Sequence, residues 1–271
     1  MRIITYVSAL LLSSNLAWGG DTLLQEHSYN YSFDNVNVGT NPNSGSVVTI
    51  FDSLNINDVN LSISGWSDVR RVDEHDNWDF KRVVGAEVQK VYDKGWAVRN
   101  PLEAEGAHQT IDNSTGQYPD YDFILLSFSE EVQLDSLNFG WANFGNGSQE
   151  VSVAAITDTG FNKLTSENST WSSIISDAVS SSFSIERLSY DRGVSNLNFS
   201  STAKYWLVGA YNTVFGTTSS GSTLNDAFKI AGLGFSNTTE TKTNTEVSEP
   251  GALALMGLGL GLVLYRRKRR V

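Results

Sequence analysis

The chain has 271 residues, of which 40% are apolar and 11% aromatic, enough to build the core of one sizeable domain. Its 30 acidic residues outnumber 19 basic ones, for a formal net charge of −11, which argues against nucleic-acid binding because that needs clustered cations. There is no cysteine, which excludes disulfide bridges, thiolate metal sites and cysteine nucleophiles.

The N-terminus has the pattern of a secretory signal peptide, residues 1–19. Arg2 gives a positive start, and residues 3–12 are apolar. Ala17 and Gly19 supply the small residues found at positions −3 and −1 of a signal-peptidase site. We therefore expect export through the Sec translocon and cleavage by signal peptidase after Gly19. A buried N-terminal helix is the alternative interpretation.

Strand patterns dominate residues 20–235. Residues 29–34 and 59–64 alternate between apolar and polar side chains, which indicates strands with one buried face. Residues 123–126 and 205–208 are apolar at both parities, as expected of strands covered on both faces. Further strands are predicted at Val47–Phe51, Arg82–Tyr92, Gly95–Arg99, Asp122–Ser129, Val132–Trp141, Glu150–Thr157, Phe183–Tyr190, Ala203–Tyr211 and Ala227–Phe235.

Two of these strands change phase partway. The apolar positions of residues 132–141 switch parity after Leu134, and those of residues 228–235 switch at Gly232. A change of one residue in the alternation predicts a β-bulge in each strand. Helical pattern is scarce, and one short helix is predicted over Thr170–Val179 with Thr170 as its cap.

These patterns predict an all-β protein. We expect one antiparallel β-sandwich, jelly-roll-like, over residues 20–235. Residues 236–246 are polar and predict a flexible linker. Without Arg2 and the five basic residues near the C-terminus, 13 Lys and Arg remain against 30 Asp and Glu, so the exported body carries a charge near −17.

The last segment, residues 247–271, has the pattern of a membrane-anchored tail. It opens with a short motif: Val247, Ser248, Glu249, Pro250 and Gly251. Residues 252–265 are apolar and rich in glycine, and they predict a short transmembrane helix below the ~20 residues of an ordinary span. Five basic residues follow: Arg266, Arg267, Lys268, Arg269 and Arg270. By the positive-inside rule they stay cytoplasmic and leave the body outside.

This order of elements resembles the PEP-CTERM tail of Gram-negative bacterial surface proteins, with its Pro-Glu-Pro signature, short hydrophobic helix and arginine cluster. Glu249 and Pro250 match the last two signature residues, whereas Ser248 stands at the place of the first proline. The resemblance implies that an exosortase in the inner membrane recognises the tail and cuts near the signature. The body would then reach the cell surface or the exopolysaccharide matrix of a biofilm.

A block in the middle of the chain resembles the recurring core of a subfamily of exosortase-dependent surface proteins with no established biochemical activity. The block consists of Gly95–Asn100, His108–Asn113, Asp122–Phe128 and Val132–Trp141. It contains a His-x-x-x-Asp-Asn turn before a buried strand and a Gly-Trp pair at the end of the next strand. The resemblance implies cargo of the same export pathway.

Asp112 and Asn113 are the candidate metal ligands. Their side-chain oxygens, together with loop carbonyls, would suit Ca²⁺, which takes oxygen ligands. The alternative is that this Asp-Asn pair starts a turn and that its side chains bind nearby backbone amides. We expect no other cofactor.

Trp66, Trp78 and Trp96 flank predicted loops and are candidates for stacking on sugar rings. The alternative is that each anchors a loop from inside, because an indole hides a large apolar area. Trp141 and Trp206 lie within strong strand patterns, and we expect both in the core.

Four acids are candidates for the carboxylate pair of a glycoside hydrolase: Glu103, Glu105, Asp120 and Asp122. Their spacing does not bring two of them to a defined separation, and no Gly-x-Ser-x-Gly elbow is present. We therefore expect no enzyme activity. The leading hypothesis is a structural or interaction protein linked to extracellular polysaccharide. A glycan-binding module, with or without Ca²⁺, is the alternative, and a polysaccharide-acting enzyme is third.

Overall fold

A computed structural model describes ten stretches of the chain: residues 22–33, 54–72, 78–91, 94–101, 110–115, 118–143, 149–166, 168–185, 193–217 and 225–242. The chain divides into two compact units. The first holds residues 1–8 and 26–237, and the second holds residues 9–25 and 238–271. The core and helices described below belong to the first unit, whereas residues 22–25 and 238–242, at the ends of two strands, belong to the second.

The secondary structure is almost entirely strand, so the all-β class is confirmed. The strands are β1 (Thr22–Ser32), β2 (Leu54–Ile56), β3 (Val59–Val72), β4 (Trp78–Val91), β5 (Gly95–Arg99), β6 (Ile111–Asp112), β7 (Ser114–Thr115), β8 (Tyr118–Pro119), β9 (Asp122–Ala142), β10 (Gln149–Ile156), β11 (Ala178–Ile185), β12 (Gly193–Asn196), β13 (Ala203–Ala210) and β14 (Ala227–Lys242). Two short helices are α1 (Asp158–Leu164) and α2 (Trp171–Ile175). The strand predicted at Val47–Phe51 lies outside the described residues.

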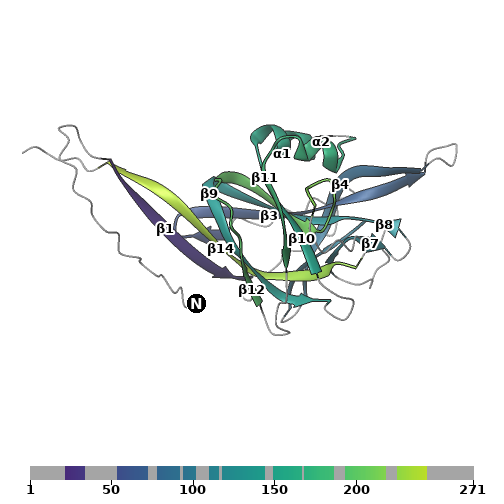
Figure 1. The fold of residues 1–271 in the computed structure, drawn as a ribbon, viewed down its shortest axis with the longest axis horizontal. Coiled ribbons are helices and arrows are strands. Elements are labelled where there is room, and N and C mark those ends of the chain that lie inside the picture. Colours follow the sequence, from purple (N-terminus) through teal and green to yellow (C-terminus); the bar gives the residue numbers. More distant parts are fainter. Residues whose placement is uncertain are drawn as a thin grey trace, which may run out of the picture. The chain divides into compact units, whose positions relative to one another are not determined.

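One continuous sheet of 12 strands replaces the two stacked sheets that the sequence predicted, and β7 and β8 form a separate two-stranded sheet (Figure 1). Its strand order is β1-β14-β5-β4-β3-β9-β13-β10-β11, and β14 also pairs with β9. The strands β14, β5, β4, β3 and β9 therefore close into a barrel of five strands, and β13, β10 and β11 continue the sheet outward from β9. Alternation along a strand shows which face is buried but not which strands pair, so it could not distinguish a closed ring from a jelly-roll sandwich.

The ring closes because β9 is long and bent. Its 21 residues join two predicted strands into one. The first half pairs with β3 and β13, and the second half pairs with β12 and β14. Both predicted bulges are present. In β9 the consecutive residues Ser136 and Leu137 are both buried, so the alternation changes phase there. In β14 the register shifts between Ile230 and Gly232. A bulge bends a strand and increases its twist, which allows β9 to serve two parts of the sheet.

Core side chains lie on both faces of the middle of the sheet. Ile124 and Leu126 of β9 join an apolar cluster inside the ring. Phe123 and Leu125 point the other way and join a second cluster with Trp171 of α2. The prediction that residues 123–126 and 205–208 are covered on both faces is therefore confirmed.

The helices α1 and α2 lie together over the outer strand β10 and cover the second cluster (Figure 1). Thr170 caps α2 as predicted, in a capping box with Ser173. The helix ends at Ile175 instead of Val179 because β11 begins at Ala178. The sequence analysis missed α1, whose start is marked by Thr157 accepting a hydrogen bond from the Gly160 amide.

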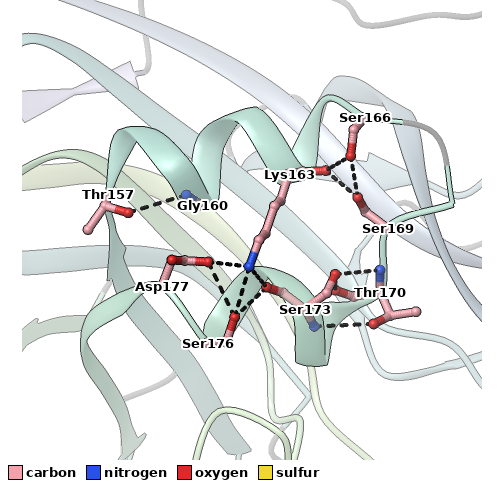
Figure 2. A network of polar contacts seen from close by, with 9 residues as sticks. All are labelled: Thr157, Gly160, Lys163, Ser166, Ser169, Thr170, Ser173, Ser176 and Asp177. Carbon is pink, nitrogen blue, oxygen red and sulfur yellow. Dashed lines mark hydrogen bonds and ion pairs between the residues drawn. The ribbon is translucent and has the colours of Figure 1, made fainter.

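One lysine connects the two helices. Lys163 Nζ lies 2.6 Å from Asp177 Oδ2 and donates to the Ser173 carbonyl and the Ser176 hydroxyl, each at 3.2 Å (Figure 2). The lysine side chain thus crosses from α1 to the residues that end α2. This network fixes the helical hairpin above the core.

The strand β14 continues through Lys242, where the sequence predicted a linker from Ser236 onward. Ser236 pairs with Gln133 in the ladder, and its hydroxyl donates to Asp135 Oδ1 at 3.2 Å. Asn237 donates its amide to the Glu130 carboxylate. The polar residues Ser236 and Asn237 therefore continue the strand beside β9, which offers them polar partners.

Candidate functional site

The predicted sorting and processing sites lie outside the described residues. They are the signal cleavage residues Ala17 and Gly19, the motif Val247–Gly251 and the basic residues 266–270. The last described residue before the motif is Lys242, which ends β14. Within the described stretches, no helix has the length and apolar character to span a membrane.

The structure buries two of the three tryptophans considered for sugar stacking. Trp66 on β3 is 5% exposed, and its Nε1 donates to Ser64 Oγ at 2.9 Å. Trp96 on β5 is fully buried and stacks on Phe33 with 4.8 Å between ring centroids. Neither indole face can reach a sugar, so both are core residues, as the alternative interpretation held. Trp78 begins β4, and its side chain lies outside the described part of the chain.

Asp112 and Asn113 are placed by a turn that their own side chains stabilise. The Asp112 carboxylate accepts from the Ser114 amide at 3.2 Å and from the Thr110 hydroxyl. Asn113 is fully buried and turns its amide toward Asp226. The two side chains therefore act on different partners and do not converge. In the described part of the chain, no group of three His, Cys, Asp or Glu side chains is arranged to hold a metal ion.

Asn113 belongs to a buried polar cluster at the start of β14 and β10. Its Nδ2 donates to Asp226 Oδ2 at 2.7 Å, and Asp226 Oδ1 accepts from the Glu150 backbone amide at 2.6 Å. Asp226 is 1% exposed. Burial, together with the neighbouring Glu150 carboxyl, raises the pKa of Asp226 to about 8, although the bonds from the Glu150 and Asn113 amides oppose the shift.

A second buried acid lies in the same region. Asp68 Oδ1 accepts from the Tyr121 amide at 2.6 Å, and Asn100 Nδ2 donates to both Asp68 O at 3.2 Å and Asp120 Oδ1 at 2.5 Å. Burial raises the pKa of Asp68 to about 7, and the Tyr121 amide partly offsets it. These contacts join β3 to the residue after β5 and to the two residues before β9.

Of the four candidate acids for glycoside hydrolysis, two accept hydrogen bonds from neighbouring side chains and two lie outside the described residues. Asp120 is bound by Asn100, and Asp122 accepts a bond from the Ser67 hydroxyl. Both carboxylates are buried. Glu103 and Glu105 lie outside the described residues. In the described part of the chain, these acids therefore hold loops to strands.

Trp141 and Lys229 were not predicted as site residues, and Trp141 was expected in the core. Trp141 is partly exposed, and Lys229 Nζ lies 4.2 Å from the centroid of its ring. The cause is a further register shift, between Lys229 and Ile230, opposite Gly140. This shift keeps Phe139 and Ala142 in the inner cluster but leaves Trp141 out of it. The one available signal was Gly140, a residue favoured at bulges.

The chain combines a β domain with a C-terminal segment that the sequence predicts to be a sorting signal. Comparison with protein families identifies that signal: residues 246–270 match the PEP-CTERM protein-sorting motif. The chain thus carries this motif, consistent with an exosortase-dependent protein, and the resemblance seen in the sequence is confirmed. The motif implies transit through a membrane, processing by an exosortase and a surface or extracellular destination. No curated protein and no solved structure matches the chain.

Proposed function

We propose that the β domain is a structural or interaction component of an extracellular polysaccharide matrix, without catalytic activity. In this proposal the chain leaves the cytoplasm through the Sec translocon and is held in the inner membrane by residues 252–265. An exosortase then cuts near Glu249 and Pro250 and releases the body. The observation that carries the proposal is the match of residues 246–270 to the sorting motif.

The interior of the domain supports a structural role. The buried acids Asp68, Asp120 and Asp226 each accept hydrogen bonds from neighbouring loops or strands. Groups used in this way stabilise loop geometry and do not present a reactive atom to a substrate. The fold therefore favours a rigid scaffold for display outside the cell.

Processing can be tested in a host that contains an exosortase and an exopolysaccharide system. Replacing Glu249 and Pro250 by alanine should leave the full-length membrane form, and deletion of residues 266–270 should give mislocalised precursor. The matched control replaces Asn244 and Thr245, just before the motif, and should be processed normally. Immunoblots of membrane, surface and matrix fractions measure each form. If both tail variants still give the short surface product, the proposal is wrong.

Ser248 permits a graded version of this test. Changing Ser248 to Pro restores the Pro-Glu-Pro signature, so we expect the processed fraction to rise or to stay complete. A loss of processing in this variant would contradict recognition of the signature by an exosortase.

We also propose that the domain needs no metal ion. The Asp112 carboxylate is used by Ser114 and Thr110, which leaves it poorly placed to bind Ca²⁺. The midpoint of thermal unfolding should be the same with a chelator and with millimolar Ca²⁺. A rise in the midpoint that depends on Ca²⁺ concentration would contradict this proposal.

A further inference from the structure

Trp141, Lys229 and Lys94 form a small cationic group on the outer side of the ring, hereafter the Lys94–Trp141–Lys229 group. Trp141 and Lys229 are partners in the β9–β14 ladder. Phe228 and Ile230, on either side of Lys229, point into the inner cluster, so Lys229 points outward. Lys94 lies in the turn between β4 and β5 and is exposed.

The turn that carries Lys94 packs directly on β9. A Cβ atom added to Gly140 would lie 2.1 Å from the Lys94 carbonyl oxygen, so only glycine permits this approach. Gly140 is the neighbour of Trp141 in the chain. The close packing therefore fixes Lys94 beside the strand pair that carries Trp141 and Lys229.

Lys229 is a buried cation that is influenced by the charges of Lys94 and Asp112. Its side chain is 7% exposed, and no hydrogen bond or ion pair to it is found within the described residues. Its ammonium instead lies over the Trp141 ring, a contact of modest strength. Burial, and then the charge of Lys94, lowers the pKa of Lys229 to about 8, while Asp112 acts in the opposite direction. A buried charge normally forms an ion pair, and none to Lys229 is found in the described stretches of the chain.

We propose that the Lys94–Trp141–Lys229 group binds the carboxylate of a uronic-acid residue in an acidic saccharide. The carboxylate would pair with the two ammonium groups, and the partly exposed indole of Trp141 would contact the apolar face of the sugar ring. This inference deepens the proposed role in an extracellular polysaccharide matrix and rests on it. In this proposal the sugar contacts the partly exposed indole of Trp141, and not Trp66 or Trp96, which are buried.

The surrounding charge restricts the ligand. The exported body carries a charge near −17, so a polyanion lying along its surface would be repelled. At physiological ionic strength this repulsion is screened beyond about 8 Å, whereas two ammonium groups act on a carboxylate at contact distance. The group therefore suits single acid groups spaced along a saccharide and does not suit nucleic acid.

Protection of Lys229 from acylation tests the site directly. The full chain, purified in detergent at pH 8, is treated with an activated acetyl ester, and mass spectrometry measures the rate at Lys229. The probes are glucuronate, glucose, acetate and inorganic phosphate. Glucuronate should slow acylation of Lys229 about tenfold at ten times its Kd, because the labelled and bound states exclude each other. Lys204, exposed on β13, is the internal control and should react at an unchanged rate.

Variants then locate the binding. Changing Lys94 to Ala should weaken glucuronate binding about fivefold, which corresponds to one partly exposed ion pair. The matched change of Lys204 to Ala should have no effect. Protection of Lys229 is measured on the unsubstituted protein, so the test does not depend on whether a substitution of Lys229 folds.

Each remaining outcome contradicts the inference. Equal protection by acetate or phosphate would mean a general anion site without sugar recognition. Protection by glucose would mean a neutral sugar site, and no protection by any probe would remove the site. These results are independent of the sorting test, because binding is measured on purified protein and processing is measured in cells.

Discussion

Asn113 and Asp226 hold each other through both backbone and side-chain hydrogen bonds. Asn113 Nδ2 donates to Asp226 Oδ2 at 2.7 Å, and the Asp226 amide donates back to Asn113 Oδ1 at 3.1 Å. The Asn113 amide also donates to the Asp226 carbonyl at 3.3 Å. The two residues are 113 positions apart, so this pair ties the turn after β6 to the start of β14.

Replacing Asn113 by Ala should therefore destabilise the domain strongly. The change removes the partner of Asp226 Oδ2 and of the buried Asp226 amide, which costs about 2–4 kcal/mol in the free energy of unfolding. Urea unfolding, followed by tryptophan fluorescence, measures the free energy of unfolding of each protein. The control Asn143→Ala, at a partly exposed position at the end of β9, should change it by less than about 0.5 kcal/mol. Equal effects of the two variants would contradict the role given to Asn113.

Stability should depend on pH through Asp68. Its pKa is raised to about 7 in the folded domain against an ordinary value of 3.8, so the folded state binds the proton more tightly. The contribution is therefore fully present below pH 4 and is lost as pH rises through about 7. The slope is at most about 1.4 kcal/mol per pH unit for one such group.

The variant Asp68→Asn isolates this effect. Asn keeps an oxygen for the Tyr121 amide but cannot ionise, so the loss of stability between pH 4 and 7 should be smaller than in the parent. Urea unfolding at pH 4, 5.5 and 7 gives the comparison. Asp58→Asn removes an exposed carboxylate from a turn and serves as the control. Identical pH profiles for the parent and Asp68→Asn would show that Asp68 is not the group responsible.

The cap of α2 should be measurable by itself. Thr170→Ala removes the hydroxyl that accepts from the Ser173 amide at 3.2 Å (Figure 2), and we expect a loss of about 1 kcal/mol. Ser172→Ala, exposed within the same helix, should have little effect because alanine favours helices. Thermal unfolding of both variants provides the test, and a loss in Ser172→Ala equal to that in Thr170→Ala would argue against the cap.

A series of Trp→Phe changes should order the tryptophans by burial and bonding. Trp206 is fully buried and donates to the carbonyls of Val132 and Ala203 at 3.1 and 3.2 Å, so its change should cost about 2–4 kcal/mol. Trp66 donates only to Ser64 and should cost about 1–2 kcal/mol. Trp141 is partly exposed and should cost less than about 1 kcal/mol. Urea unfolding measures the three values. A large cost at Trp141 would mean that it is a core residue, as the sequence pattern suggested.

Sequence patterns predicted the individual strands well because alternation reports burial directly. The strand predicted at Gly95–Arg99 has the observed bounds, and residues 123–126 are covered on both faces. The bulge near Gly232 was readable because a phase change leaves a mark in one strand alone. At Gly140 the bulge was not recognised, since Trp141 kept the parity of Leu137 and Phe139, and its exposure was therefore mispredicted.

The sequence by itself determined the sorting signal and the β class, since the tail motif and strand alternation are local signals that need no partner to be read. Only the tertiary structure decided that β9 and β14 close the ring, that Asn113 binds Asp226, and that Lys229 lies over Trp141. These contacts depend on which strands pair and in which register. A single sequence does not contain that information in any local pattern, because many pairings bury the same apolar faces equally well.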